Sequence, residues 1–348
     1  MSNVLLTYIV PVYNTAPYLP KCLQSLVNQG LQPDEYEVIA VDDGSKDDSR
    51  EVIEAFAKDH PQVRLITQAN AGVSAARNRA LDLAHGRFVQ FVDSDDYLEE
   101  NVMGPLLHRA VDDNLDVLMF NFKWVDTDDN FIKMSKPRDD MSTTPVMSGT
   151  EFLSQYTLMQ YVCWYLVSLE HLNNLNLRFD TSLIACEDGA LAAKFLLHAR
   201  QVAFSDAAPY CYVNRSDSAM NNTNRDHLRR RIFSQIDAAA LINSSIKEYE
   251  ATTGAQSPAS VTGLRNLYLF FSMTKSLTCG CVDEAVAHMR ELGLYPFPCI
   301  GPETNYIGTK WKILHGLMMH PKLWALLSWI YGKVKTEYEY FCLSQSNG

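Results

Sequence analysis

Polar clusters follow four apolar runs in the N-terminal part of the chain, at the points where buried strands would end. In an open α/β sheet, ligands bind just beyond the carboxyl ends of the strands. If the four strands are parallel, the clusters lie along one edge of the sheet and can contact one ligand. A single such cluster is ordinary turn chemistry, whereas four in succession indicate a binding site. The clusters are Tyr13-Asn14, Asp42-Asp43-Gly44-Ser45, Asn70-Ala71-Gly72 and Asp93-Ser94-Asp95-Asp96.

The last cluster has the form of a metal site. Asp93 and Asp95 are alternate carboxylates after a strand, and together they can hold a hard divalent cation that keeps coordination sites for phosphate oxygens. Such an ion neutralises a diphosphate leaving group. The alternative is a structural role, in which Ser94 or Asp95 caps a helix that starts near Tyr97. Both roles hold together if Asp96 caps the helix while Asp93 and Asp95 bind.

Two further candidates lie on predicted helices. Arg77 follows the third strand among small residues, where its planar guanidinium can meet a base edge or a phosphate. Glu187-Asp188 opens a helix after Cys186. These carboxylates either match the helix dipole or include a general base that deprotonates an acceptor hydroxyl as it attacks an anomeric carbon. Their spacing is compatible with both interpretations, and either carboxylate fits the role of base.

Alternating strand and helix signals position these residues. Strands are expected over Leu5–Val12, Tyr36–Val41, Val63–Thr67 and Phe88–Val92. Helices are expected over Pro17–Gln29, Asp47–Asp59 and Val73–His85. We expect Ser45 to cap the second helix. The alternation indicates βαβ units on a mostly parallel sheet, and thus an α/β fold class.

The pattern loosens beyond the fourth cluster. Helices are expected over 99–114, 150–160 and 185–200, strands over 116–124, 202–204 and 209–214, and a loop or hairpin over 126–144. After Arg225 the chain becomes mainly helical, with segments over 225–250, 259–278, 281–292 and 304–338. We place a domain boundary near residue 222, after a polar stretch.

Composition excludes several classes of protein. The chain has 348 residues, of which 47% are hydrophobic, so it can bury a sizeable core. Its formal net charge of -11 argues against non-specific nucleic-acid binding. The eight cysteines form no CxxC pair and are expected to be reduced. Neither a signal peptide nor a bilayer-spanning run is predicted, so we expect a cytoplasmic protein.

The four clusters, in this order, resemble the motifs of family 2 glycosyltransferases. The similar segments are Tyr8–Asn14, Val38–Ser49, Asn70–Asn78 and Gly86–Asp96. A weaker resemblance continues through Trp164–Phe179, which precedes the Glu-Asp pair, and Tyr210–Ser218 after it. Gly189 departs from the family pattern, because many relatives carry another acidic or polar residue directly after that pair.

The resemblance implies a GT-A fold with a helical C-terminal extension. Residues 1–222 would be the catalytic domain, with a donor half over 1–98 and an acceptor half over 99–222, and 223–348 the helical region. The residues implied to bind a nucleotide sugar are Pro11, Tyr13, Asn14, Asp42, Asp43, Asn70, Arg77, Asp93, Ser94, Asp95, Arg215 and Ser218.

Individual roles follow from the same resemblance. Tyr13 would lie near the base, and Asp42 or Asp43 would contact uracil or ribose. Asp93 and Asp95 would bracket the ribose, the sugar and a Mn²⁺ or Mg²⁺ ion, and Arg215 and Ser218 would close over the diphosphate. Asp188 would be the catalytic base, with Glu187 placing the acceptor or supporting Asp188.

The expected activity is inverting transfer of a sugar from a UDP-sugar to a hydroxyl of a saccharide or lipid-linked acceptor in surface polysaccharide synthesis, as a hexosyl- or N-acetylhexosaminyltransferase. The alternative is a non-catalytic nucleotide-sugar-binding or scaffold protein. A nucleotidyltransferase is disfavoured, because Tyr13–Pro17 stands where a glycine-rich phosphate loop is required. A dinucleotide oxidoreductase is disfavoured for want of a GxGxxG motif after the first strand.

Residues 303–343 interleave lysines with Trp, Leu and Ile. This mixture favours either a contact with a membrane surface or helices that pack on the catalytic domain or on another subunit of a homo-oligomer. The membrane interpretation implies a peripheral location on the inner face of the cell membrane.

Overall fold

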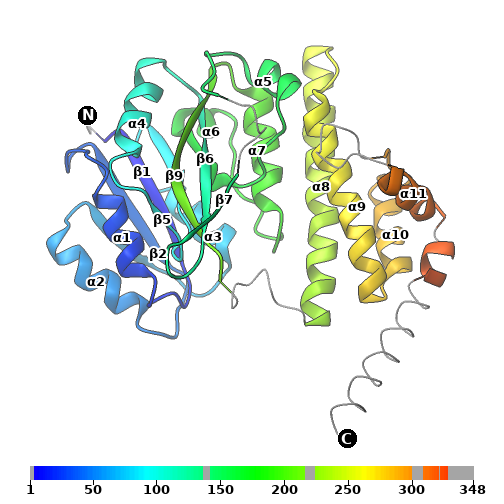
Figure 1. Ribbon diagram of the computed structural model, residues 1–348, viewed down its shortest axis with the longest axis horizontal. Helices are drawn as coiled ribbons and strands as arrows, with labels where there is room; N and C mark the ends of the chain where they lie inside the picture. The colour runs from blue at the N-terminus through cyan, green and yellow to red at the C-terminus, as the bar shows by residue number, and fades with distance from the viewer. Residues whose placement is uncertain (1–3, 136–141, 216–223, 300–308, 321, 328–348) are drawn as a thin grey trace, which may run out of the picture. The chain divides into compact units, whose positions relative to one another are not determined.

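The computed structural model describes residues 4–135, 142–215, 224–299, 309–320 and 322–327. The chain divides into two compact units (Figure 1). The first comprises 1–182 and 187–218, and the second comprises 183–186 and 219–348. The first unit contains the β-sheet, and the second is helical.

The first four strands form the parallel part of the sheet. They are β1 (Leu6–Val12), β2 (Tyr36–Asp42), β3 (Val63–Thr67) and β4 (Phe88–Phe91). Their order is β3-β2-β1-β4, and neighbouring strands are parallel. Every residue of β1 and β2 is buried, as expected for strands covered on both faces. The predicted alternation of strands and helices is confirmed, so the four polar clusters follow strands that end at one edge.

Helices connect these strands, and one predicted cap is wrong. The connecting helices are α1 (Leu19–Val27), α2 (Ser49–Asp59) and α3 (Val73–Leu81). Ser45 does not cap α2, because its Oγ accepts the backbone N–H of Asn14 at 3.0 Å. Asp47 lies just before α2 instead, and its Oδ1 accepts the backbone N–H of Ser49 at 3.2 Å and the Ser49 hydroxyl at 2.6 Å.

The helix predicted over 99–114 is present as α4 (Met103–Asp112) but begins later than expected, because Tyr97 and Leu98 form a strand. Strand β5 (Tyr97–Leu98) pairs antiparallel with Cys211 and Tyr210. The backbone N–H of Leu98 donates to Ser25 Oγ at 3.0 Å. Because neighbouring segments take up these backbone groups, a helix cannot form directly after Asp96.

Five further strands complete a nine-stranded mixed sheet in the order β3-β2-β1-β4-β8-β6-β9-β5, with β7 on β6. In addition to β5 they are β6 (Val117–Val125), β7 (Phe131–Ser135), β8 (Tyr165–Ser168) and β9 (Val202–Val213). Strand β9 is continuous where the sequence predicts two strands, because a register shift opposite Phe120 and Phe122 absorbs the irregular residues. The predicted hairpin is confirmed for β6 and β7.

Shorter helices surround the second half of the sheet. They are α5 (Gly149–Gln155), the 3₁₀ helix η1 (Val162–Trp164), α6 (Leu169–Asn174) and α7 (Glu187–His198). Helix α5 begins with a capping box, in which Ser148 Oγ accepts the backbone N–H of Glu151 at 3.2 Å and the Glu151 carboxylate accepts the N–H of Ser148 at 2.8 Å. Helix α7 positions Glu187 and Asp188 in its first turn.

The second unit is helical, as predicted. Its helices are α8 (Arg225–Thr253), α9 (Ala259–Cys279), α10 (Val282–Glu291) and α11 (Thr309–Met318). Figure 1 shows α8 and α9 side by side. Both end at a glycine of positive φ, Gly254 and Gly280, the usual termination of a helix. The Trp324 indole donates to the carbonyl of Met273 at 3.0 Å.

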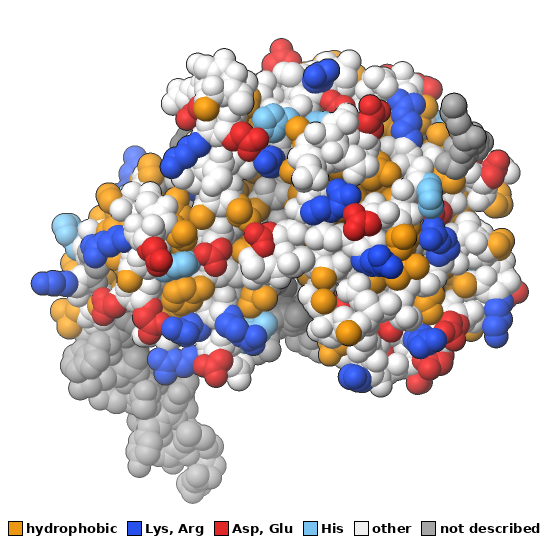
Figure 2. Space-filling view, turned by 180° about the vertical axis from the view of Figure 1, so that it is seen from behind, with side chains coloured by type: hydrophobic (Ala, Val, Ile, Leu, Met, Phe, Trp, Pro, Cys, Tyr) orange, Lys and Arg blue, Asp and Glu red, His pale blue; other side chains and the backbone are white. Residues whose placement is uncertain are grey.

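The surface mixes charges of both signs. Figure 2 shows acidic and basic side chains intermingled on the face it presents, with hydrophobic side chains scattered among them. Among the described helices, none combines the length and the apolar character that a bilayer crossing requires. Of the segment 303–343 that is predicted to touch a membrane, only 309–320 and 322–327 belong to the described residues.

Candidate active site

Hydrogen bonds join the first two clusters at the edge of the parallel strands. Asn14 adopts a positive φ of 54°, and its Oδ1 accepts the backbone N–H of Lys46 at 2.7 Å. The N–H of Asn14 donates to Ser45 Oγ. Asp42 is buried and accepts the N–H of Ser45 at 3.0 Å. Asn14 and Asp42 therefore shape the loops, whereas Tyr13 is 48% exposed.

Asp43 joins the second cluster to the third. Its Oδ1 accepts Gln68 Nε2 at 2.8 Å and the N–H of Ala71 at 2.9 Å. Its Oδ2 accepts the N–H of Gly72 at 2.8 Å. These three bonds occupy a buried carboxylate and hold the loop that presents Asn70, whose side chain is exposed.

Pro11 and Ser94 stabilise the same edge. Pro11 pairs with Val41 and lies beyond the last residue pair of β1 with β4, Ile9 with Phe91. Successive residues of a strand direct their backbone groups toward opposite neighbouring strands. The nitrogen of Pro11, which carries no hydrogen, therefore lies beyond the end of β4, and no hydrogen bond of the sheet is lost. Ser94 is buried, and its Oγ accepts the hydroxyl of Thr15 at 2.9 Å.

Asp96 anchors the fourth cluster and does not cap a helix, in contrast to the prediction. Its carboxylate accepts the Tyr210 hydroxyl at 2.7 Å and the N–H of Val213 at 2.8 Å. The Tyr210 oxygen in turn accepts the N–H of Asp93 at 3.1 Å. Burial, together with the charges of Asp95 and Asp93, raises the pKa of Asp96 well above its ordinary value. Tyr210, the first residue of the Tyr210–Ser218 segment, thus holds the segment that carries Asp93 and Asp95.

Arg77 brings the separate carboxylates together. Its Nη2 donates to Asp93 Oδ1 at 2.9 Å, while its Nη1 donates to Glu187 Oε1 at 3.1 Å and to Asp188 Oδ1 at 2.7 Å. We call Arg77, Asp93, Glu187 and Asp188 the charged centre. Only 5% of the Arg77 side chain is exposed. Burial acts to lower the pKa of Arg77, but the three carboxylates outweigh it and keep the guanidinium charged.

Asp188 carries the most informative shift in this centre. Burial raises the pKa of Asp188 to about 7, and the charges of Glu187 and Asp93 act in the same direction. The Arg77 guanidinium and the N–H of Val162, which donates to Asp188 Oδ2 at 3.3 Å, oppose the rise. A carboxylate with a pKa near neutrality can both accept and release a proton at physiological pH.

Arg215 bonds to Asp95 through Nη2, and its guanidinium carbon lies 4.2 Å from the centre of the Tyr18 ring. Burial and the charge of Asp93 raise the pKa of Asp95, whereas Arg215 lowers it. Ser218, the predicted partner of Arg215, lies outside the described residues.

Asp93 and Asp95 fit a hard divalent cation. Their side chains are 37% and 28% exposed, so both carboxylates are accessible beside the loops of the edge. The described part of the chain gathers no cluster of three or more metal-binding side chains. Two carboxylates that share an ion with phosphate oxygens are the usual arrangement for Mg²⁺.

The sequence does not reveal the residues that support Arg77 by packing and hydrogen bonding. Asn78 Nδ2 donates to the carbonyl of Phe179 at 2.8 Å, and the N–H of Phe179 donates to Asn78 Oδ1 at 2.8 Å. Phe179 also lies under Arg77, with 5.2 Å between the guanidinium carbon and the ring centre. Asn78 belongs to the third motif, but its partner 101 residues away leaves no local signal.

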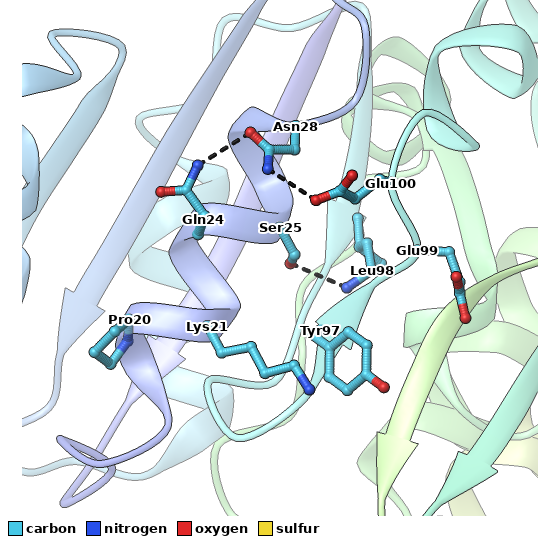
Figure 3. Close-up of a pocket in the computed structure, with 9 residues that line it drawn as sticks. All are labelled: Pro20, Lys21, Gln24, Ser25, Asn28, Tyr97, Leu98, Glu99 and Glu100. Carbon is cyan, nitrogen blue, oxygen red and sulfur yellow. Dashed lines mark hydrogen bonds between the residues drawn. The ribbon is translucent and has the colours of Figure 1, made fainter. Parts of the chain in front are cut away.

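A separate hollow of about 490 Å³ lies between α1 and β5. Figure 3 shows Lys21 reaching across it, with Nζ 3.6 Å from the centre of the Tyr97 ring. Asn28 Nδ2 donates to Glu100 Oε1 at 3.1 Å on its far side. None of its lining residues is among the predicted site residues, so it is distinct from the strand-end site.

Comparison with known proteins shows a similarity to one family. The model of the family described as glycosyl transferase family 2 matches residues 7–171. The uncharacterized glycosyltransferase YibD of Escherichia coli is 30% identical over 230 residues, which cover 65% of this chain and 64% of that protein. Residues 7–171 therefore resemble glycosyltransferase family 2, and the chain spans 64% of the length of YibD.

Solved structures confirm the predicted fold. TarS 1-349 of S. aureus, crystallised in complex with UDP, matches with a TM-score of 0.68 at 20% identity, over 95% of this chain and 92% of that chain. Mannosyltransferase PcManGT from Pyrobaculum calidifontis, in complex with GDP-Man and Mn²⁺, matches with a TM-score of 0.53 at 16% identity, over 93% and 86%. The predicted GT-A fold with a helical C-terminal region is therefore confirmed.

Proposed function

We propose that the chain moves a sugar from a UDP-sugar to a hydroxyl of a saccharide or lipid-linked acceptor, with inversion, in the synthesis of surface polysaccharide. One observation carries the proposal: a single guanidinium joins Asp93, at the end of the parallel strands, to Asp188, at the start of α7. Asp188, the carboxylate that receives a proton, is thereby fixed close to Asp93, the carboxylate that faces the donor.

In this mechanism Asp188 is the general base. The acceptor hydroxyl gives its proton to Asp188 as its oxygen attacks the anomeric carbon. The bond from that carbon to the diphosphate breaks, and the electron pair leaves with UDP. A pKa raised to about 7 makes Asp188 a stronger base than a solvated aspartate. Glu187 shares Nη1 of Arg77 with Asp188, and we assign it the positioning of that base.

The donor would lie along the edge of β1 to β4. Tyr13 and Asn70 expose their side chains there, and the buried Asp42 and Asp43 hold their loops. TarS crystallised with UDP and with UDP-GlcNAc supports a uridine nucleotide, and we propose a hexosyl or N-acetylhexosaminyl group. Arg215, paired with Asp95, is the cation that we assign to the diphosphate, together with Ser218.

Asp93 and Asp95 would hold a Mn²⁺ or Mg²⁺ ion. When bound, that ion would neutralise negative charge on the departing diphosphate. The Mn²⁺ of PcManGT supports the proposal. Arg77 and Arg215 each occupy one oxygen of these carboxylates, so the protein balances part of their charge itself.

The exposed apolar side chains of the described C-terminal helices support a peripheral membrane location. Ile313, Leu323 and Leu326 are 60%, 40% and 50% exposed. Sedimentation with anionic liposomes tests this proposal. Binding that weakens as salt rises supports it, and the absence of salt-dependent binding contradicts it.

The decisive experiment compares UDP binding with turnover. The protein is incubated with Mn²⁺ and a panel of UDP-sugars and acceptors, and UDP release and the thermal shift are measured. We expect Asp188→Asn to abolish transfer and retain the shift by UDP. Glu51→Gln, which changes an exposed first-turn carboxylate of α2, is the matched control. Binding of UDP without turnover in wild type would instead support a non-catalytic binding protein.

A further inference from the structure

Five aromatic residues form a continuous cluster in the first unit. Phe122 lies 4.2 Å from Trp164, and Trp124 lies 4.4 Å from Tyr212, between ring centres. Tyr161 lies 5.3 Å from Trp164, and Phe122 lies 5.6 Å from Trp124. We call these five residues the aromatic wall. Tyr161 is 38% exposed, and Trp124 and Tyr212 are partly exposed, so the wall reaches solvent.

The register of β6 and β9 places part of the wall on the same face of the sheet as the Tyr210 side chain, which bonds to the fourth cluster. Phe122 pairs with Tyr210, and Trp124 pairs with Tyr212. Side chains two residues apart on a strand share a face. The Tyr210 hydroxyl bonds to Asp96 and to the N–H of Asp93, so Trp124 and Tyr212 project on the same side as that hydroxyl.

The other part of the wall adjoins the proposed base. Tyr161 and Trp164 flank Val162, whose N–H donates to Asp188 Oδ2 at 3.3 Å. The wall is thus tied to the Asp93–Asp96 segment through β9 and to Asp188 through η1.

The indole nitrogen of Trp164 is a buried polar atom that could bind a ligand. The residue is only 6% exposed, and its indole Nε1 has no hydrogen-bond partner among the described residues. A buried indole N–H usually finds an acceptor, and one left unpaired is unfavourable. An oxygen that enters beside the wall would remove this cost.

We propose that the aromatic wall is the acceptor subsite and binds a pyranose ring, with the Trp164 N–H donating to one of its oxygens. This inference rests on the proposed glycosyl transfer and names its acceptor chemistry. A pyranose presents an apolar C–H face that packs on aromatic rings, and hydroxyl oxygens at its edge that accept hydrogen bonds. Bound on the wall, a hydroxyl of this ring reaches Asp188 while the donor lies along β1 to β4.

Trp164→Phe tests the inference, because it removes the N–H and keeps an aromatic ring. The acceptors are the p-nitrophenyl β-glycosides of glucose, galactose and N-acetylglucosamine, and the donor is the UDP-sugar that wild type uses. We expect the acceptor KM to rise about tenfold, as for the loss of one hydrogen bond, while the donor KM is unchanged. Trp124→Leu should raise the acceptor KM as well. Phe56→Leu removes an aromatic ring of α2 that stacks on His60, and it should change neither constant.

The outcomes separate this inference from the proposed function. An unchanged acceptor KM in Trp164→Phe and Trp124→Leu, with transfer intact, overturns the subsite and leaves glycosyl transfer standing. If wild type releases no UDP, saturation-transfer NMR with the same glycosides in the presence of UDP decides instead. Signals lost in both variants support the subsite, and signals equal to wild type, or none in wild type, overturn it. Both variants must keep the thermal shift by UDP, which shows that they are folded.

Discussion

The strand-end loops and the charged centre are built differently. In the loops, Asn14, Asp42 and Asp43 bond mainly to backbone N–H groups, which fixes the path of the chain. In the charged centre, side chains from distant segments converge on Arg77 with little backbone support. On the proposed function, the loops would define the shape of the donor site and the charged centre would control the protonation of the base. Substitutions in the two regions should therefore change different kinetic constants.

Asp188→Asn should have the largest effect. Without a general base, kcat should fall by about 10²–10⁴-fold, while UDP binding, followed by thermal shift, stays at the wild-type level. Glu187→Gln should reduce kcat less, because it removes a neighbour of the base and not the base itself. Equal losses in the two variants would contradict the assignment of Asp188 as the base.

Arg77→Met should have the next largest effect, and it should lower stability as well as the rate. Removing the cation from a buried ionic cluster costs about 3–5 kcal/mol, because three carboxylates lose their common partner. Denaturant unfolding measures this loss. Arg79→Met is the matched control, since Arg79 is exposed on the same helix and should leave the free energy of unfolding nearly unchanged. A stable Arg77→Met protein with wild-type kcat would contradict the role of the charged centre in stability and catalysis.

Asp95→Asn should produce a smaller and more specific loss. The extra thermal shift that Mn²⁺ adds to UDP should disappear, because one of two proposed carboxylate ligands is gone. The shift by UDP alone should remain. Asp129→Asn, on an exposed loop, should retain the Mn²⁺ effect, and an Asp95→Asn protein that also retains it would refute the metal assignment.

Asp43→Ala should have the smallest effect on chemistry. It frees the N–H groups of Ala71 and Gly72, so the loop that carries Asn70 loosens. We expect a donor KM raised by about fivefold, which corresponds to about 1 kcal/mol, the typical contribution of one hydrogen bond, with kcat near wild type. A fall in kcat without a change in KM would contradict the assignment of donor binding to the loops and of proton transfer to the charged centre.

Local patterns in the sequence are sufficient to predict the parallel strands and the edge along which the clusters lie. A strand that is buried on both faces, followed by turn residues, is visible within about ten residues. Strand β5 lies where the sequence predicts the start of a helix, because its pairing with Cys211 is remote and leaves no local signal. The meeting of Arg77 with Asp188, 111 residues apart, likewise depends on tertiary packing. For Glu187-Asp188 the spacing leaves a helix-dipole role and a base role open, and the structure adds Arg77 as the partner.

The pH dependence of kcat/KM tests the central claim most directly. Asp188 must be ionised to accept a proton, and its pKa is raised to about 7, so kcat/KM should rise with pH and reach half its limiting value near pH 7. Arg77 lowers the pKa of Asp188, so Arg77→Met should move this rise to higher pH. A profile that is flat from pH 5.5 to 8.5, or a rise that stays in place in Arg77→Met, would contradict the account.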